Sequence, residues 1–335
     1  MLPDNIQAVS AFLPNTPLLK LDDPWLKKFD INLYIKRDDL IDQRVSGNKF
    51  RKLKYALSHY TESNYKGIVS FGGPWSNHLH ALSLLTNLYK IPFVVIIRGE
   101  KPANLSATLK DIIQSGADVH YVSRSNYREF RDLSAQGVLH LHPYMKYWRE
   151  HLLIPEGGAT KDALAGIAEI LLEDERQFDA IYLPCGTATT LAGLSLGLAE
   201  HSQTKLVGIA ALKAGNSLDE NMRRLIQEEG SNPKLNWTIY QDFHFGGFAK
   251  IDNDLVNFMM GLYQRTKLIT EPIYTGKTLF ALYQHIEQGL YEKGSQIMML
   301  HTGGLQGLRG YVGRGLDELI EQSSVCSEME IKKDC

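Results

Sequence analysis

The chain has 335 residues, of which 44% are hydrophobic and 22% are charged, the composition of an ordinary globular protein. Its formal net charge of −2 at pH 7 gives no support to binding of nucleic acid or of an anionic membrane surface. The length exceeds what one hydrophobic core usually holds and therefore predicts two domains.

Neither a secretory leader nor a membrane span is expected. The first residues, Met1 to Asn5, lack the basic and apolar regions of a signal peptide, and no uninterrupted apolar run is long enough to cross a bilayer. The three cysteines, Cys185, Cys326 and Cys335, form neither a disulfide framework nor a CxxC metal pair. We therefore expect a cytoplasmic protein without a metal site.

Short β-branched apolar runs alternate along the chain with longer helix-like segments. The predicted strands cover residues 33–36, 67–71, 93–97, 119–122, 180–183, 206–211 and 296–300. The predicted helices cover residues 49–58, 77–89, 104–115, 161–175, 190–200, 217–229, 252–265, 277–288 and 305–319. Such alternation is typical of α/β folds, in which ligands bind at loops beyond the carboxyl ends of parallel strands.

One lysine stands at the start of the first predicted helix. Ser46 and Asn48 are good N-cap residues, and Gly47 lets the chain turn. The helix dipole and the basic residues that follow are both expected to lower the pKa of Lys49. An amine of this kind forms Schiff bases with aldehydes. Alone, the segment is more typical of a basic, solvated helix face.

Two further turns follow predicted strands and carry groups suited to anions. After the strand 67–71, two glycines turn the chain and Ser76 and Asn77 open a helix, which offers a hydroxyl and amides to a carboxylate. Simple N-capping would explain the same residues. The next residue, His78, is expected to be a helix-face residue rather than a base.

The other turn leads from the strand 180–183 into a helix through small and hydroxyl-bearing residues, which form an anion nest. It has neither the GK[ST] of a P-loop nor a GxGxxG pattern. The alternative is a capped helix with Thr189 as N-cap. The turn consists of Gly186, Thr187, Ala188, Thr189 and Thr190.

Taken together and in this order, these segments resemble the pyridoxal phosphate (PLP)-dependent enzymes of fold type II, the tryptophan synthase β family. Within it they resemble the branch of D-cysteine desulfhydrase and 1-aminocyclopropane-1-carboxylate (ACC) deaminase. The matching blocks, spread over nearly the whole chain, are Thr16-Pro17-Leu18, Lys36-Arg37-Asp38-Asp39, Ser46-Gly47-Asn48-Lys49, Arg51-Lys52-Leu53, Ser76-Asn77-His78, residues 186–193, Tyr274-Thr275-Gly276-Lys277 and His301-Thr302-Gly303-Gly304.

The resemblance implies an α/β fold of two open, twisted, mostly parallel sheets flanked by helices. It implies a large PLP-binding domain from residues 1–54 and 156–335, with a small domain, residues 55–155, inserted. It also implies a homodimer that acts on a small amino-acid substrate. Lys49 would carry PLP and move the substrate α-proton. Asn77 would bind the PLP 3′-oxygen, and Ser76 and His78 would lie at the substrate.

The resemblance assigns the other cofactor contacts to the later blocks. Residues 186–190 would hold the PLP phosphate, and Tyr274 would face the substrate. Thr302 or Thr275 would meet the pyridine nitrogen. Glycines are common in the family at positions 188 and 189, and the residues found there are tolerable if their φ angles stay negative.

The reaction that this resemblance predicts is α,β-elimination from D-cysteine, or from a similar small D-amino acid, to pyruvate, ammonia and hydrogen sulfide. ACC deaminase is the alternative, less expected because such enzymes tend to have glutamate at the position of Thr275. Trp75 stands where the family usually has glutamine, and Phe248 where a second tyrosine is expected. These departures keep open a protein of another class, one that binds PLP or an amino acid without turnover.

Overall fold

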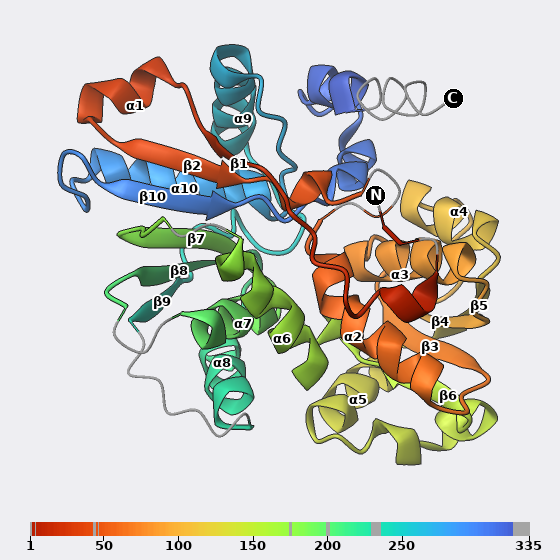
Figure 1. Cartoon of the computed structure of the whole chain (residues 1–335). Helices are drawn as coiled ribbons and strands as arrows, with labels where there is room; N and C mark the ends of the chain where they lie inside the picture. The colour runs from red at the N-terminus through yellow and green to blue at the C-terminus, as the bar shows by residue number, and fades with distance from the viewer. Residues whose placement is uncertain are drawn as a thin grey trace. The chain divides into compact units, whose positions relative to one another are not determined.

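The computed structural model describes residues 2–3, 5–42, 45, 47–173, 176–198, 202–228 and 236–323 (Figure 1). By mutual packing the chain divides into a first unit, residues 1–12 and 49–163, and a second unit, residues 13–48 and 164–335. The expected large and inserted domains stay a prediction, and these units place residues 49–54 with the segment assigned to the inserted domain. None of the described helices is long and apolar enough to cross a membrane.

The first unit contains a four-stranded parallel sheet in the order β5-β4-β3-β6. Its strands are β3 (Gly67–Gly72), β4 (Phe93–Arg98), β5 (Asp118–Val122) and β6 (His151–Ile154). Its helices are α2 (Lys49–Glu62), α3 (Asn77–Leu88), α4 (Ala107–Gln114) and α5 (Arg124–Ala135). The central strands are buried almost throughout, as parallel strands covered on both faces must be.

The second unit contains a six-stranded sheet in the order β1-β2-β10-β7-β8-β9, in which only the β1–β2 pair is antiparallel. Its strands are β1 (Leu18–Lys20), β2 (Asn32–Lys36), β7 (Ala180–Cys185), β8 (Lys205–Ala210), β9 (Trp237–Tyr240) and β10 (Gln296–Leu300). Its helices are α1 (Pro24–Phe29), α7 (Thr189–Gly197), α8 (Ser217–Glu228), α9 (Asn253–Thr266) and α10 (Thr275–Glu287). The boundary between the two units falls inside α6 (Lys161–Ala168), whose residues from Leu164 onward belong to the second unit. The expectation of two mostly parallel sheets flanked by helices is confirmed.

Sequence patterning failed at the sheet edges and near the end of the chain. The edge strands β1, β6 and β9 were not predicted, because with only 3, 4 and 4 residues they are too short to stand out as strands in the sequence. The predicted helix over 305–319 is wrong. A 3₁₀ helix, η7 (Leu305–Tyr311), is followed by a turn in which Gly313 and Gly315 have positive φ angles of 69° and 82°.

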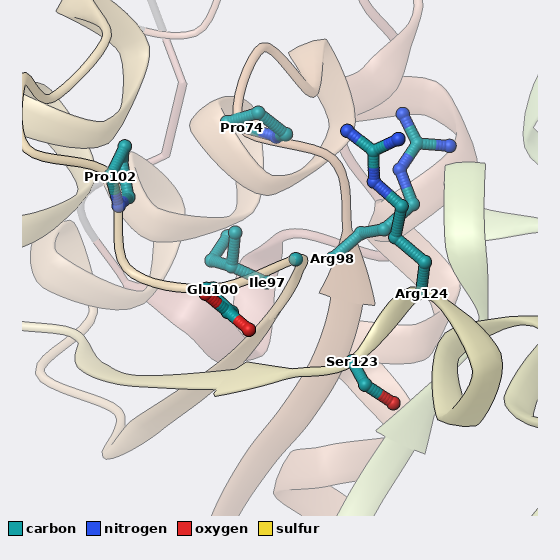
Figure 2. Close-up of a pocket in the computed structure, with 8 residues that line it drawn as sticks. Pro74, Ile97, Arg98, Glu100, Pro102, Ser123 and Arg124 are labelled. Atoms are coloured by element: carbon teal, nitrogen blue, oxygen red, sulfur yellow. The ribbon is translucent and has the colours of Figure 1, made fainter.

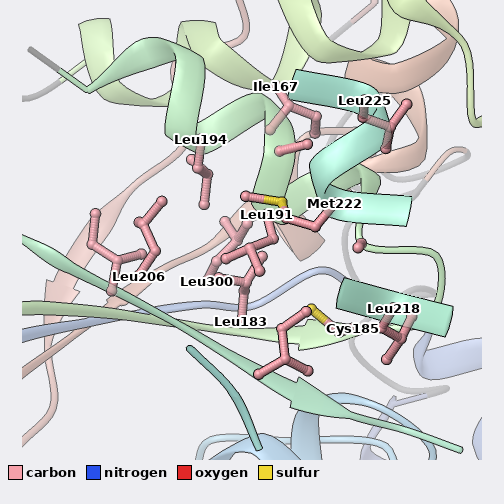
Figure 3. Close-up of a cluster of buried hydrophobic side chains, with 14 of the residues drawn as sticks. Ile167, Leu183, Cys185, Leu191, Leu194, Leu206, Leu218, Met222, Leu225 and Leu300 are labelled. Atoms are coloured by element: carbon pink, nitrogen blue, oxygen red, sulfur yellow. The ribbon is translucent and has the colours of Figure 1, made fainter. Parts of the chain in front are cut away.

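The larger sheet of the second unit is packed on both faces. One core joins side chains of β7 and β8 to α7 and α8, and it includes Leu183, Leu191, Leu206 and Met222 (Figure 3). The opposite core joins the same sheet to α10. Cys185 lies within the first of these cores, as expected of a small buried hydrophobic residue.

The close approach of α7 to α6 makes a glycine test possible. A Cβ atom at Gly193 would lie 2.6 Å from Ile167 Cβ, whereas a Cβ atom at Gly261 in α9 would meet only the flexible end of Arg265, at 3.2 Å. Gly193→Ala should therefore lower the free energy of unfolding by about 1–3 kcal/mol. Gly261→Ala should raise it by about 0.5–1 kcal/mol. Urea unfolding midpoints measure both, and shifts of the same sign would contradict this packing.

Candidate active site

The residues before α2 are tied to two distant loops of the second unit. The backbone N–H of Asn48 donates to the carbonyl of Thr302 at 3.3 Å, and its side-chain amide donates to the Thr190 hydroxyl at 3.1 Å. Gly47 has a φ of 88°, and a Cβ atom there would lie 2.1 Å from the Thr302 carbonyl oxygen. Only glycine fits this approach, so the point at which α2 starts is set by contacts far away in sequence. Ser46 lies outside the described residues.

Lys49 is the first residue of α2 and is partly exposed. The basic residues after it, Arg51, Lys52 and Lys54, are at most 4% exposed, and the Lys54 ammonium donates to the carbonyl of Phe12 at 3.0 Å. The alternative interpretation of this segment as a solvated basic face is therefore wrong. Such burial is unusual, because lysine and arginine side chains are almost never fully buried unless they are paired.

The start of α3 presents the first unit's other candidate residues. Ser76 is the N-cap, and its hydroxyl oxygen accepts from the backbone N–H of Leu79 at 3.2 Å. The oxygen is used in capping, but the hydroxyl hydrogen stays available for a ligand. Asn77 begins the helix, and both residues are partly exposed. The cap therefore agrees with both interpretations of this turn.

His78 is buried beneath this turn. Its Nε2 lies 2.9 Å from the Ser70 hydroxyl, and its Nδ1 has no hydrogen-bond partner among the described residues. Burial lowers the pKa of His78 to about 3, and the positive charges of Lys49 and Lys52 act in the same direction. The imidazole is therefore neutral near pH 7. This agrees with the expected helix-face role and disfavours service as a base.

The loop before α7 adopts a strained turn. Ala188 is the N-cap residue, with a φ of 56° and no side-chain capping bond, so the alternative of a Thr189 cap is wrong and the condition of a negative φ is not met at Ala188. A left-handed alanine costs about 1–2 kcal/mol, but it belongs to the geometry in which successive amides face one anion. Asn221 supports the turn by donating to the Thr187 carbonyl at 2.6 Å.

Tyr274 lies beside the first residue of that loop. If Gly186 carried a Cβ atom, it would be 3.3 Å from the Tyr274 ring and 3.6 Å from its hydroxyl. The ring of Phe248 is 6.1 Å from the Tyr274 ring in an edge-to-face arrangement. The second unit thus assembles the nest, the tyrosine and an adjacent ring that carries no hydroxyl.

A buried carboxylate fixes the turn that carries Tyr274. Glu271 is fully buried and accepts hydrogen bonds from the backbone N–H groups of Ile273, Tyr274 and Thr275 at 2.7–2.8 Å. Burial raises the pKa of Glu271, and these hydrogen bonds oppose the rise. Sequence reasoning did not select Glu271, because it lies four residues before α10 and not at the N-cap position.

The two threonines expected near the pyridine nitrogen differ in their surroundings. The Thr275 hydroxyl is fully buried and lies 3.2 Å from the Glu271 carboxylate and 3.0 Å from the Glu271 backbone nitrogen. Thr302 is partly exposed, and its hydroxyl has no hydrogen-bond partner in the described part of the chain. Thr302 is therefore the better placed of the two to meet a ligand.

Lys277 is a further functional candidate that sequence reasoning missed. Its buried ammonium donates to the carbonyls of Ala211, His244 and Gly247 at 3.3, 2.9 and 3.1 Å. It therefore holds the chain that leads directly to Phe248. Burial lowers the pKa of Lys277 to about 8, against the opposing negative charge of Glu271. A lysine within an otherwise apolar helix face was the available signal.

Comparison with known proteins identifies the cofactor chemistry. A family model described as "Pyridoxal-phosphate dependent enzyme" matches residues 9–303. The chain belongs to this family. It is therefore a PLP-dependent enzyme, as predicted. Among the described residues, no group of three or more histidine, cysteine or acidic side chains could hold a metal ion.

Similar curated proteins carry both names suggested by the sequence. A putative ACC deaminase of Pyrococcus horikoshii is 28% identical, over 91% of this chain and 96% of its own length. A bifunctional D-cysteine desulfhydrase/ACC deaminase of Arabidopsis thaliana is 27% identical, over 89% of this chain and 78% of that protein. A D-cysteine desulfhydrase of Klebsiella pneumoniae is 22% identical, over 83% of this chain and 88% of that protein.

Solved structures confirm the expected fold type. The crystal structure of an ACC deaminase homologue superposes with a TM-score of 0.74 at 28% identity, covering 95% of this chain and all of that one. A threonine deaminase of Solanum lycopersicum shares the fold alone, at 16% identity and a TM-score of 0.62, over 94% of this chain and 90% of that one.

The residues present fit PLP. The α7 start offers uncapped amides and threonine hydroxyls, which suit a phosphate without any cationic side chain. Lys49 offers an amine of the kind that PLP-dependent chemistry needs, and Thr302 offers a hydroxyl with no partner among the described residues. Each group would suit a different part of the cofactor, and these roles stay a prediction.

We predict that substitution separates the two threonines. Thr302→Val should weaken PLP binding by about 3- to 10-fold, because a ligand hydrogen bond is lost, and should leave the unfolding of the PLP-free protein unchanged. Thr275→Val should instead lower the free energy of unfolding by about 1–3 kcal/mol, because it leaves the buried Glu271 carboxylate less satisfied. PLP titration by visible absorption and urea unfolding measure the two effects. The reverse pattern would assign Thr275 to the cofactor.

We also predict a pH signature for Lys277. Its pKa is about 8 in the folded state and 10.5 in the unfolded state, so the unfolded chain binds more protons between these values. Wild-type stability should therefore rise relative to Lys277→Met by roughly 2–3 kcal/mol between pH 7 and pH 10. Urea unfolding at several pH values measures this difference. Lys293→Met, at an exposed position, is the control, and a difference that stays constant with pH for Lys277→Met would refute the assignment.

Proposed function

We propose that this enzyme deaminates a small amino acid to a 2-oxo acid and ammonia, with PLP held by Lys49 and by residues 186–190. The observation that carries the proposal is the contact of Asn48 with Thr190 and Thr302. It joins the residue before Lys49 to the proposed phosphate loop and to the proposed ring contact. A homodimer is also proposed from the family resemblance, and the solution mass of the purified enzyme tests it.

The proposed division of labour uses groups whose surroundings have been described. When bound, PLP withdraws electrons from the substrate. Lys49 would move protons at the substrate carbon, and the Ser76 hydroxyl would donate to the substrate carboxylate. Asn77 would bind beside it, and Tyr274 would lie at the substrate. His78 would support the turn from below as a neutral side chain, because its pKa is about 3.

The first substrate candidate is ACC, which with water would give 2-oxobutyrate and ammonia. The relatives support it by name, since the 28%-identical relatives and the solved homologue bear the ACC deaminase name, whereas proteins named only D-cysteine desulfhydrase are 22–23% identical.

The second candidate is D-cysteine, which with water would give pyruvate, ammonia and hydrogen sulfide. One observation favours it: Thr275 stands where ACC deaminases tend to have a glutamate. In the structure the Thr275 hydroxyl is hydrogen-bonded within its own turn. This limits the weight of that observation, because a side chain engaged there is less available to the cofactor.

A substrate panel with a matched lysine pair tests the proposal. The PLP-loaded enzyme is assayed with ACC, D-cysteine, L-cysteine, β-chloroalanine and D-serine for 2-oxobutyrate, pyruvate and sulfide. Lys49→Ala should lose the visible band of bound PLP and at least about 100-fold of the turnover. Lys66→Ala, at an exposed ion pair with Glu150, should keep both. Normal turnover by Lys49→Ala would contradict the role proposed for Lys49. If the wild-type protein shows the visible band but forms no product from any substrate, a binding protein is favoured.

A further inference from the structure

The first unit contains a cavity whose lining residues have no assigned role in the proposed reaction. It has a volume of about 430 Å³ and lies outside the carboxyl ends of β4 and β5 (Figure 2). Ligands of open α/β sheets bind at this edge of the sheet, and the volume is in the range of small-molecule sites. Its position and size therefore suit a small ligand.

Two arginines give the cavity its chemistry. Arg98 is the last residue of β4 and Arg124 the first of α5, and both side chains line the cavity and are exposed. Neither makes an ion pair with a carboxylate in the described part of the chain. In Figure 2 both guanidinium groups extend in the same direction. Two like charges on one cavity repel each other until an anion binds between them.

Arg98 is held in place without an acid. Its guanidinium lies over the ring of Tyr127, 5.5 Å from the ring centre, and 3.4 Å from where a Gly73 side chain would begin. The nearby carboxylate of Glu156 is engaged elsewhere, because it accepts from the Tyr127 hydroxyl at 2.5 Å and lies 3.7 Å from Arg131. The hydrogen-bonding edge of Arg98 is thus left for a ligand.

The rest of the lining adds one acid and apolar surface. Glu100 is the acidic residue among the lining residues, and in Figure 2 its carboxylate points away from the two guanidinium groups. Pro74 and Pro102 add apolar surface, and the Ser106 hydroxyl donates to the carbonyl of Pro74. A ligand with an anionic head group would match the two arginines, and a short carbon skeleton would match the apolar surface of the two prolines.

We propose that this cavity binds the carboxylate of a small organic acid through Arg98 and Arg124. A guanidinium and a carboxylate form paired, parallel hydrogen bonds, which makes arginine the usual partner of such a group. The carboxylate has two possible sources. It belongs to a free acid, or to the side chain of an amino acid bound at the Ser76 turn, since Ser76 N–H donates to the carbonyl of Gly73 beside Arg98. Only the second source rests on the proposed function.

Calorimetry on the PLP-loaded enzyme tests the free acid, with succinate as the probe and its neutral diamide as the ligand control. Arg98→Met and Arg124→Met should each weaken succinate binding by about tenfold or more. Arg98→Lys should restore part of it. Arg128→Met is the matched control, because Arg128 is an exposed residue of α5 that does not line the cavity. An equal loss in Arg128→Met would show unspecific charge and overturn the proposal.

Kinetics test the side-chain source with S-carboxymethylcysteine and S-ethylcysteine, each as both enantiomers. Elimination from the first breaks its Cβ–S bond and, with one water, gives pyruvate, ammonia and thioglycolate. Arg98→Met should raise KM about tenfold or more for the acidic substrate and leave KM for S-ethylcysteine unchanged.

Each combination of results decides the proposal. A loss seen by calorimetry assigns the cavity to a free acid, and a loss seen only in KM assigns it to a substrate side chain. Absence of both effects in folded Arg98→Met and Arg124→Met proteins overturns it. Calorimetry needs no turnover, so its result stands even if the enzyme deaminates none of the substrates tested.

Discussion

The hydrogen bonds of Asn48 are the constraint on which the site depends. They fix the residue before α2 to Thr190, at the start of α7, and to Thr302, after β10. Gly47 makes this possible because any side chain there would overlap the Thr302 carbonyl. Lys49 directly follows Asn48 in the chain, and the two loops that hold Asn48 carry the proposed phosphate nest and the Thr302 hydroxyl, which has no partner among the described residues. In the proposed site, the lysine that would carry the cofactor thus directly follows a residue held by the loops proposed to bind it.

The second unit accepts unfavourable features around that framework, and each of them positions a group. Ala188 takes a left-handed conformation at the nest, Glu271 is a buried carboxylate and Lys277 a buried ammonium. Glu271 holds the backbone of Tyr274, while Lys277 holds the chain before Phe248. Each of the two buried charges thus fixes the backbone at or next to one of the two adjacent rings, Tyr274 and Phe248. Strain and buried charge of this kind persist where the surroundings over-determine them, typically at functional sites.

The local sequence pattern predicted the elements whose formation depends on nearby residues. The buried strands β3, β4, β7, β8 and β10 were recognised as short apolar runs, and the amphipathic helices by the periodicity of their apolar residues. The edge strand β9 and the turn after η7 were missed. The pairing of β9 and the glycine conformations of the turn depend on contacts with other segments and not on the local sequence. Residues 186–190 were predicted to form an anion nest from their residue types, and that stays a prediction, whereas the positive φ of Ala188 was not predicted. The Asn48–Thr190 contact joins residues 142 positions apart, so no window of sequence could contain it.

The buried charges of the first unit bear on which side chains could move protons in the proposed reaction. Three buried basic residues follow Lys49 in α2, whereas residues 186–190 contribute no cation. The charge of Lys52 helps to hold His78 neutral, with a pKa of about 3, so the imidazole neither attracts a proton nor adds positive charge near pH 7. In the proposed reaction, proton movement beside the Ser76 turn would then fall to Lys49 and to hydroxyl groups. Phe248 lacks a hydroxyl, so in the proposed reaction Tyr274 would be the ring that meets the substrate, and Glu271 fixes the backbone of that residue.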